Sequence, residues 1–227
     1  MKKLILFFLI TCCSSNGLFS QAISDAGLWA TFNVEKKMSK RLEVSFTQGY
    51  RLKENYTQTN LFYTSVGVSY KPLGFMKVSV SYRTTQKARL DESYSFRHRL
   101  TMDVLLKKKF GKFSASFRQR IQTQVNNVYS SETGQLPAWY AREKVEVGYD
   151  LDKPIKPFAS VELRYQLNNP RDMELNGTWN RVRYSAGLDY KINEKNAFSL
   201  YYMIQRGFNV PEPQHLYITG LAYTLSL

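Results

Sequence analysis

Arginines recur at alternate positions in several segments of the chain, and carboxylates accompany them. The tripeptides at 97–99, 118–120 and 181–183 each begin and end with arginine. Guanidinium groups pair with carboxylates through two parallel hydrogen bonds, and they bind free anions with the same donors. We therefore predict that these side chains meet in one internal charge network. Its expected members are Glu43, Arg83, Arg97, Arg99, Asp103, Arg118, Arg120, Arg142, Glu146, Glu162, Arg164, Arg181, Arg183 and Asp189.

Other residue types give no pattern typical of catalysis or metal binding. The two histidines, His98 and His215, have no second histidine or acidic residue at metal-ligand spacing. Gly111 and Gly134 belong to no phosphate-binding glycine motif. An interfacial lipid hydrolase using His98 is one alternative, but the sequence shows no accompanying nucleophile motif. We expect no enzymatic activity, no metal and no cofactor.

Apolar and polar residues alternate from Ala26 onward in segments of roughly ten residues, a period typical of β-strands. In one segment Leu42, Val44 and Phe46 share a face, and Glu43 lies on the other. No helical periodicity competes, so the sequence predicts an all-β fold. The candidate strands are 28–35, 41–52, 60–70, 77–86, 95–106, 112–125, 139–150, 157–168, 179–190, 197–206 and 215–226.

The connections between these strands alternate in length. Closed antiparallel barrels of outer membranes have tight periplasmic turns and longer external loops. We predict a single closed up-and-down transmembrane β-barrel of 10–12 strands. Because such bacterial barrels have an even strand number, either residues 21–27 begin another strand or 28–35 is not a strand. The short connections are 36–40, 71–76, 107–111, 151–156 and 191–196, and the longer ones are 87–94, 126–138, 169–178 and 207–214.

Lysines gather around the short connections. Lysines at a membrane surface attract anionic lipid headgroups. The formal net charge of +14 also raises the question of nucleic acid, but the signal-like N-terminus and the segregation of most lysines to the short connections favour lipid as the partner. We therefore expect no nucleic acid partner. The lysines concerned are Lys36, Lys37, Lys40, Lys71, Lys77, Lys107, Lys108, Lys109, Lys112, Lys153, Lys156, Lys191 and Lys195.

Residues 1–20 have the charged start, short apolar centre and small-residue tail of a secretory signal peptide. Cleavage after them would leave residues 21–227 as the barrel. Cys12 and Cys13 both lie in the leader, so the mature chain would contain no thiol and no disulfide. A lipid anchor on one of these cysteines is the alternative, but Thr11 fits a lipoprotein cleavage site poorly.

The apolar face of each strand faces either lipid or the interior of a soluble, lipocalin-like barrel, and periodicity alone does not separate the two. The leader and the aromatic residues near strand ends favour lipid, because aromatic girdles lie at membrane interfaces. The last strand is apolar on one face up to Leu227 and resembles the C-terminal signal read by barrel-assembly machinery. The aromatic residues near strand ends include Trp29, Tyr50, Phe62, Trp139, Trp179 and Tyr190.

Sparse motifs spread along the whole mature chain carry a resemblance to a known family. They are Tyr82-Arg83, Arg97-His98-Arg99, Arg118-Gln119-Arg120, Ala141-Arg142, Pro157-Phe158, Glu162-Leu163-Arg164-Tyr165, Arg181-Val182-Arg183, Gly187-Leu188-Asp189-Tyr190 and Gly220-Leu221-Ala222-Tyr223, with Trp29 near the start. In these the chain resembles the domain-of-unknown-function 2490 family. The resemblance implies an outer-membrane barrel of Gram-negative bacteria, and it implies no activity, substrate or catalytic residue.

We therefore expect an outer-membrane barrel of unknown biochemical activity. Long side chains can fill a lumen of this size, so the first expectation is a lumen packed with paired arginines and acids. The alternative is a narrow anion-selective channel or carrier, because nine arginines of the network face only five acids. The expected partners are outer-membrane lipid, the barrel-assembly machinery through the C-terminal strand and, under the alternative, a small anionic ligand.

Overall fold

Eleven β-strands and one short 3-10 helix, η1, make up the regular structure of this computed structural model, which describes residues 23–89, 93–126, 135–171 and 173–227. The predicted all-β fold is confirmed, and each candidate strand corresponds to one of the eleven. The strands are β1 (Ile23–Lys37), β2 (Leu42–Lys53), β3 (Gln58–Leu73), β4 (Met76–Ala88), β5 (Tyr94–Phe110), β6 (Phe113–Asn126), β7 (Ala138–Tyr149), β8 (Ile155–Asn168), β9 (Thr178–Lys191), β10 (Asn196–Gly207) and β11 (Gln214–Ser226), and η1 is Met173–Leu175.

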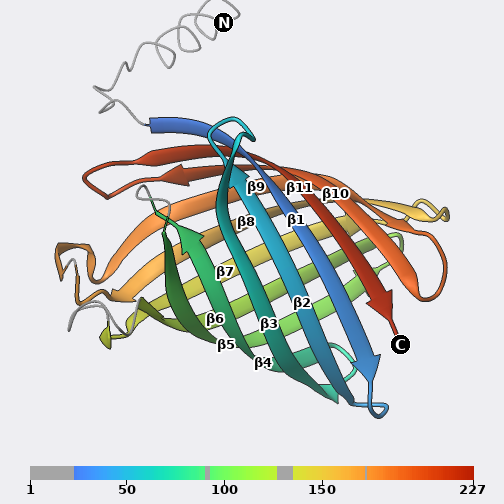
Figure 1. Cartoon of the computed structure of the whole chain (residues 1–227). Helices are drawn as coiled ribbons and strands as arrows, with labels where there is room; N and C mark the ends of the chain where they lie inside the picture. The colour runs from blue at the N-terminus through green and yellow to red at the C-terminus, as the bar shows by residue number, and fades with distance from the viewer. Residues whose placement is uncertain (1–22, 90–92, 127–134, 172) are drawn as a thin grey trace, which may run out of the picture.

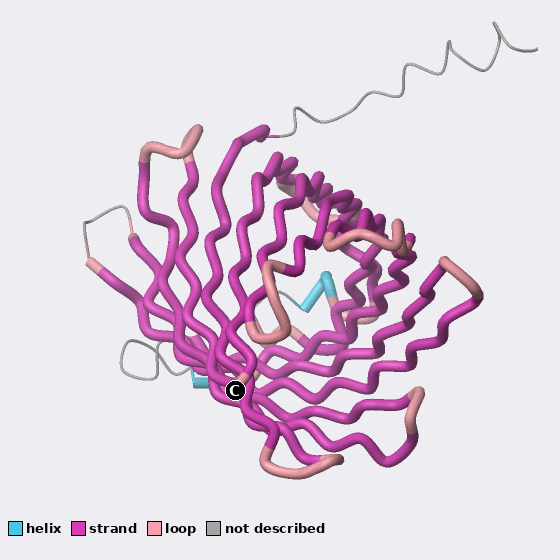
Figure 2. Tube along the Cα trace, turned by 90° about the vertical axis from the view of Figure 1, so that its right-hand side faces the viewer, coloured by secondary structure: helices cyan, strands magenta, loops and turns pink. Residues whose placement is uncertain are grey.

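The barrel directs the two faces of each strand to opposite sides. On β2, the outward Val44 and Phe46 are 39% and 41% exposed, whereas the neighbouring Glu43 is only 7% exposed. Large exposed apolar side chains occur on every strand from β1 to β10, and Figure 2 shows the strands encircling one axis. The apolar face is therefore the outer face, and the charged face lines the interior. This is the opposite of a soluble ligand carrier with an apolar interior.

The barrel closes through a parallel pair of strands. Each strand from β1 to β10 pairs antiparallel with the next one along the chain, and β1 then pairs parallel with β11 from Ile23↔Gln214 to Glu35↔Ser226. With an odd number of up-and-down strands, the first and last strands run in the same direction, so only a parallel pair can close the ring. The predicted closed barrel of 10–12 strands is confirmed with the eleven strands read from the sequence, and the general even-number rule does not hold for this chain. Residues 23–27 extend the first strand and begin no other.

The two ends of the barrel differ, as the connection lengths predicted. We call the end formed by turns 38–41, 74–75, 111–112, 150–154 and 192–195 the short-turn rim, and the opposite end the loop rim. Because the strand number is odd, β1 begins at the loop rim and β11 ends at the short-turn rim, and Figure 1 shows the start of β1 and the end of β11 at opposite ends of the barrel. The loop rim also carries one tight turn, 54–57, where the Asp25 carboxylate accepts the backbone N–H groups of Glu54 and Asn55.

Several strands, among them β1, β3 and β5, are longer than the sequence predicted. Strand β5 continues to Phe110, so Lys107 to Lys109 belong to the strand end and not to a turn. The sequence did not predict this extension, because a run of three lysines has no alternation of apolar and polar residues. The lysines nevertheless pair with residues 114–116 of β6 and so extend the strand. In the described ranges, no helix is long and apolar enough to cross a membrane. The same residues contain no cluster of three or more histidine, cysteine or acidic side chains able to hold a metal.

Candidate functional site

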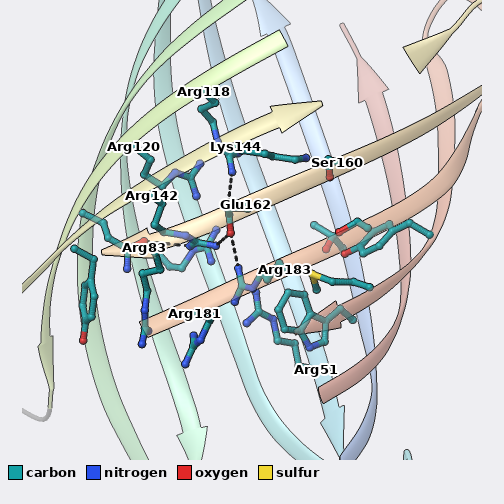
Figure 3. Close-up of a pocket in the computed structure, with 18 of the residues that line it drawn as sticks. Arg51, Arg83, Arg118, Arg120, Arg142, Lys144, Ser160, Glu162, Arg181 and Arg183 are labelled. Carbon is teal, nitrogen blue, oxygen red and sulfur yellow. Dashed lines mark hydrogen bonds and ion pairs between the residues drawn. The ribbon is translucent and has the colours of Figure 1, made fainter. Parts of the chain in front are cut away.

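A cavity of about 630 Å³ occupies the interior of the barrel, a volume within the usual range of ligand-binding pockets. Its wall is mostly cationic: ten arginines and Lys144 line it, against the acids Glu146, Glu162 and Asp189. Figure 3 shows the arginines reaching from several strands into the common space. Most of the predicted network lies here. The predicted residues in the wall are Arg83, Arg97, Arg99, Arg118, Arg120, Arg142, Glu146, Glu162, Arg164, Arg181, Arg183 and Asp189.

Strand register places four arginines side by side. Across β6, β7, β8 and β9, residue pairing aligns Arg120 with Arg142, Arg142 with Arg164, and Arg164 with Arg181. We call these four residues the arginine row. Like charges directly opposite one another destabilise a sheet. The arginine row therefore costs stability unless counter-charges or a bound anion offset the repulsion.

One carboxylate, Glu162, serves three of the nearby arginines. Arg118 Nη2 donates to Glu162 Oε2 at 2.6 Å, Arg183 Nη1 donates to Oε1 at 3.1 Å, and Arg142 Nη2 also donates to Oε1. Dashed lines in Figure 3 mark these contacts. Glu162 is 7% exposed, so this bridge lies in a largely desolvated part of the wall. A single negative charge shared by three guanidiniums leaves a local excess of positive charge.

The ends of the arginine row differ in their partners. Arg120 forms a two-pronged ion pair with Asp103, through Nε at 2.7 Å and Nη2 at 2.6 Å. Arg164 Nε donates to Asn180 Oδ1 at 2.8 Å, and its guanidinium lies 5.0 Å from the ring centre of Tyr140. Among the described residues, no hydrogen bond or ion pair holds the Arg181 side chain. Positive charge therefore accumulates toward the β8–β9 end of the arginine row.

Neutral groups hold the arginines on the other wall. The guanidinium carbon of Arg51 lies 3.6 Å from the ring centre of Trp29, and that of Arg83 lies 3.8 Å from the ring centre of Tyr63. Arg99 donates to the side-chain oxygen of Gln124, with Nε at 3.0 Å. Aromatic rings and amides orient a guanidinium without cancelling its charge. These arginines are therefore fixed in place and still cationic.

Glycines on neighbouring strands let two tyrosine rings lie flat against the wall. A Cβ atom on Gly49 would come within 2.1 Å of the Tyr63 ring, and one on Gly220 within 2.0 Å of the Tyr201 ring. Each glycine is the direct cross-strand neighbour of its tyrosine. The close approach therefore keeps both rings out of the middle of the cavity, and it fixes Tyr63 beneath Arg83.

The sequence model of a family of proteins of unknown function, DUF2490, matches residues 26–215. The chain belongs to this family. The predicted resemblance is thereby confirmed, and the family description adds no activity. No curated protein matches the chain.

Two solved structures resemble this family member. The β domain of the Bordetella autotransporter BrkA is 10% identical with a TM-score of 0.48, over 80% of this chain and 82% of that chain. The NanC porin is 12% identical with a TM-score of 0.49, over 79% of this chain and 85% of that chain. These identities are too low to carry a ligand or a residue role from either structure to this one.

Three predicted positions in this DUF2490 chain lie apart from the main cavity wall. Glu43 lies near the short-turn rim, where Lys71 and Lys77 reach it at 3.5 and 3.3 Å. Asp103 contacts the cavity only through its pair with Arg120. His98 lies on the outer face, where Nδ1 is 2.6 Å from the hydroxyl of the exposed Tyr82.

Sequence reasoning missed several residues of the site. Trp29 was expected among interfacial aromatics, and this was wrong, because it lines the cavity beneath Arg51. Arg51 itself follows the period-two pattern of Glu43 and Gly49 on β2, so the sequence did contain a signal for it. Tyr63 shares the period-two pattern of Ser65, Gly67 and Ser69 on β3, so the sequence contained a signal for its face as well.

Proposed function

We propose that this protein is an outer-membrane β-barrel whose arginine-lined lumen accepts anions, as a narrow channel or carrier. The observation that carries the proposal is the arginine row, in which four guanidiniums in direct register face a cavity. Asp103 and Glu162 pair with Arg120 and Arg142. Arg164 and Arg181 are direct cross-strand partners with no ion pair among the described residues, and opposing like charges add nothing to a purely structural network. A passing or bound anion would offset the repulsion, and rings of arginine favour anions in pores.

The outer surface supports the membrane part of the proposal. Exposed Val, Leu, Ile and Phe side chains surround the barrel on β1 to β10, over a far larger area than the apolar patches of soluble monomers. Lipid is the environment in which such a surface is stable, and closure of the ring satisfies the strand backbones there. Lysines at the short-turn rim suit contact with anionic headgroups on the periplasmic side.

A lumen packed as a structural network is the second candidate, and the Glu162 bridge favours it. This carboxylate binds three arginines from three other strands and so ties β6, β7, β8 and β9 together. Under this candidate the arginines hold the barrel wall, and no anion passes. The two candidates differ in one measurable property, which is anion flux.

Membrane location is tested with the full-length chain expressed in a Gram-negative host. We expect recovery in the outer-membrane fraction and faster gel migration of the unheated protein than of the boiled protein. Recovery in the soluble periplasmic fraction would contradict the membrane assignment.

Anion passage is tested by chloride efflux from lipid vesicles that contain the refolded protein. We expect efflux that falls when Arg183→Glu places an acid beside Glu162. The matched control is Glu54→Gln, which changes a charge on the exposed 54–57 turn and should leave efflux unchanged. Vesicles that hold chloride equally well with and without the protein would favour the structural network.

A further inference from the structure

We propose that the arginines on the loop side of the lumen form a binding site for a multivalent oxyanion, a molecule with two or more phosphate or carboxylate groups. This inference rests on the proposed anion-accepting lumen and adds the ligand class and the side of entry. We define the loop-side cluster as Arg51, Arg83, Arg99, Arg164 and Arg181.

Charge is sorted along the barrel axis. Five strands, β2, β5, β7, β8 and β9, carry both an arginine and an acid of the lumen, and on each of them the arginine lies nearer the loop rim. On β2, for example, Glu43 follows the short-turn rim and Arg51 precedes the loop rim; on β9, Arg181 follows the loop rim and Asp189 precedes the short-turn rim. Lysines accompany the acids on the short-turn side, with Lys71 and Lys77 on Glu43 and Lys144 on Glu146. The loop side carries the arginines, so an anion that enters past the long connections meets arginines first.

Neutral groups hold four of the five members of the loop-side cluster, all except Arg181. Trp29, Tyr63, Gln124 and Asn180 contact Arg51, Arg83, Arg99 and Arg164, and within the described ranges no ion pair involves a cluster member. Fixed guanidiniums without counter-ions are preorganised for an external anion, because binding then requires neither side-chain ordering nor breaking of an internal ion pair.

The cluster spans two opposite walls, which indicates a ligand with more than one anionic group. In the ring order of the strands, β2 and β4 lie across the barrel from β8 and β9. Arg51 and Arg83 therefore face Arg164 and Arg181 across the lumen. A single small ion contacts one wall at a time, whereas an oxyanion with two charged groups neutralises both at once. The cavity of about 630 Å³ has room for such a molecule.

Unused hydrogen-bond donors lie in the same cavity wall. The Nε atoms of Arg97, Arg118 and Arg142 are buried and have no hydrogen-bond partner among the described residues. Buried donors are nearly always satisfied by protein, water or ligand. Arg97 also lines the cavity on the loop side of Arg99, where it extends the site toward the loop rim.

The test uses a tryptophan that lies in the site. Of the three tryptophans, Trp139 and Trp179 are on the outer face, so Trp139→Phe with Trp179→Phe leaves Trp29 as the single reporter beneath Arg51. The refolded protein in neutral detergent is titrated with pyrophosphate, with citrate and with chloride at constant ionic strength. We expect a saturable fluorescence change with pyrophosphate or citrate and none with chloride at equal ionic strength.

Variants of the reporter protein place the ligand. Arg83→Gln and Arg181→Gln each remove one charged hydrogen-bond donor from opposite walls and should weaken pyrophosphate binding about tenfold. Lys77→Gln, at the short-turn rim, makes the same change in net charge outside the cluster and should leave the affinity unchanged. Heat-modifiable gel migration confirms that each variant is folded.

Several outcomes would overturn the proposal. They are the absence of a saturable change with both multivalent ions, a chloride effect equal to theirs, and equal weakening by Lys77→Gln and Arg83→Gln. Pyrophosphate binding without citrate binding would support the site and assign it to phosphate groups. Because the titration requires no flux, a protein that binds pyrophosphate but releases no chloride contradicts channel function alone, and one that releases chloride without binding contradicts this site alone.

Discussion

At the scale of single residues, Glu162 sets the balance between the stability of the wall and the charge offered to an anion. It is the only described carboxylate that contacts three arginines, and it lies in the middle of β8 beside the arginine row. Breaking a buried ion pair by removing one partner leaves an uncompensated charge and is strongly destabilising. Removal of the Glu162 carboxylate would also leave its three arginines in the cavity without this counter-charge.

We therefore expect Glu162→Gln to lower the free energy of unfolding by about 3 kcal/mol and to increase chloride efflux. Urea unfolding in lipid vesicles measures the first effect, and vesicle efflux measures the second. Glu54→Gln is the control, because the pair of Lys53 with Glu54 is exposed and surface pairs contribute little. A variant as stable as the wild type, with unchanged efflux, would contradict the role given to Glu162.

Arg181 is expected to behave in the opposite way. Its side chain has no ion-pair partner in the described part of the chain and lies opposite Arg164 in the register. Arg181→Gln should raise the free energy of unfolding by roughly 0.5 kcal/mol, because it removes a like-charge contact. Urea unfolding again measures this. A loss of stability as large as that of Glu162→Gln would show that Arg181 has a structural partner.

At the scale of strands, the alternation of apolar and polar residues located every strand. It did not show which residues pair across neighbouring strands. The candidate strand 112–125 differs from β6 by one residue at each end, because its apolar spacing is regular throughout. The alignment of Arg120, Arg142, Arg164 and Arg181 depends on which residues pair across four strands, and loop lengths do not specify that. The sequence therefore predicted an arginine-rich interior and left the arginine row undetected.

The glycines beside the lumen tyrosines give a prediction at this scale. Gly49→Ala places a Cβ about 2.1 Å from the Tyr63 ring, so the ring must move away from Arg83. We expect a loss of roughly 1–3 kcal/mol in the free energy of unfolding. Gly74→Ala is the matched control, because a Cβ atom added at Gly74 would have no other atom within 4 Å. Equal stability of the two variants would show that Tyr63 adapts freely.

The parallel seam between β1 and β11 is also testable by chemistry. Ala30 and Leu221 are direct partners, and parallel neighbours are close enough for a disulfide. We expect Ala30→Cys with Leu221→Cys to cross-link under mild oxidation and to change migration on a non-reducing denaturing gel. The pair Ala30→Cys with Leu225→Cys should not cross-link, because Leu225 lies farther along β11 and is the partner of Val34. Cross-linking of the second pair in preference to the first would contradict the register.

At the scale of the whole molecule, the sequence predicted a barrel of 10–12 strands with an apolar exterior and unequal rims, but the odd strand number departs from the general rule for bacterial barrels. The even-number rule comes from barrels closed by antiparallel pairs, whereas this chain closes through β1 and β11 in parallel. The consequence is a molecule with its two described ends on opposite rims and a lumen polarised from arginine to carboxylate along the axis.

The most direct test of an anion-accepting lumen is the reversal potential of the purified protein in a planar lipid bilayer under a potassium chloride gradient. We expect a current whose reversal potential has the sign of chloride selectivity and moves toward zero when Arg183→Glu is introduced. A reversal potential with the sign of potassium selectivity, or a bilayer that stays silent with folded protein present, would contradict an anion-accepting lumen.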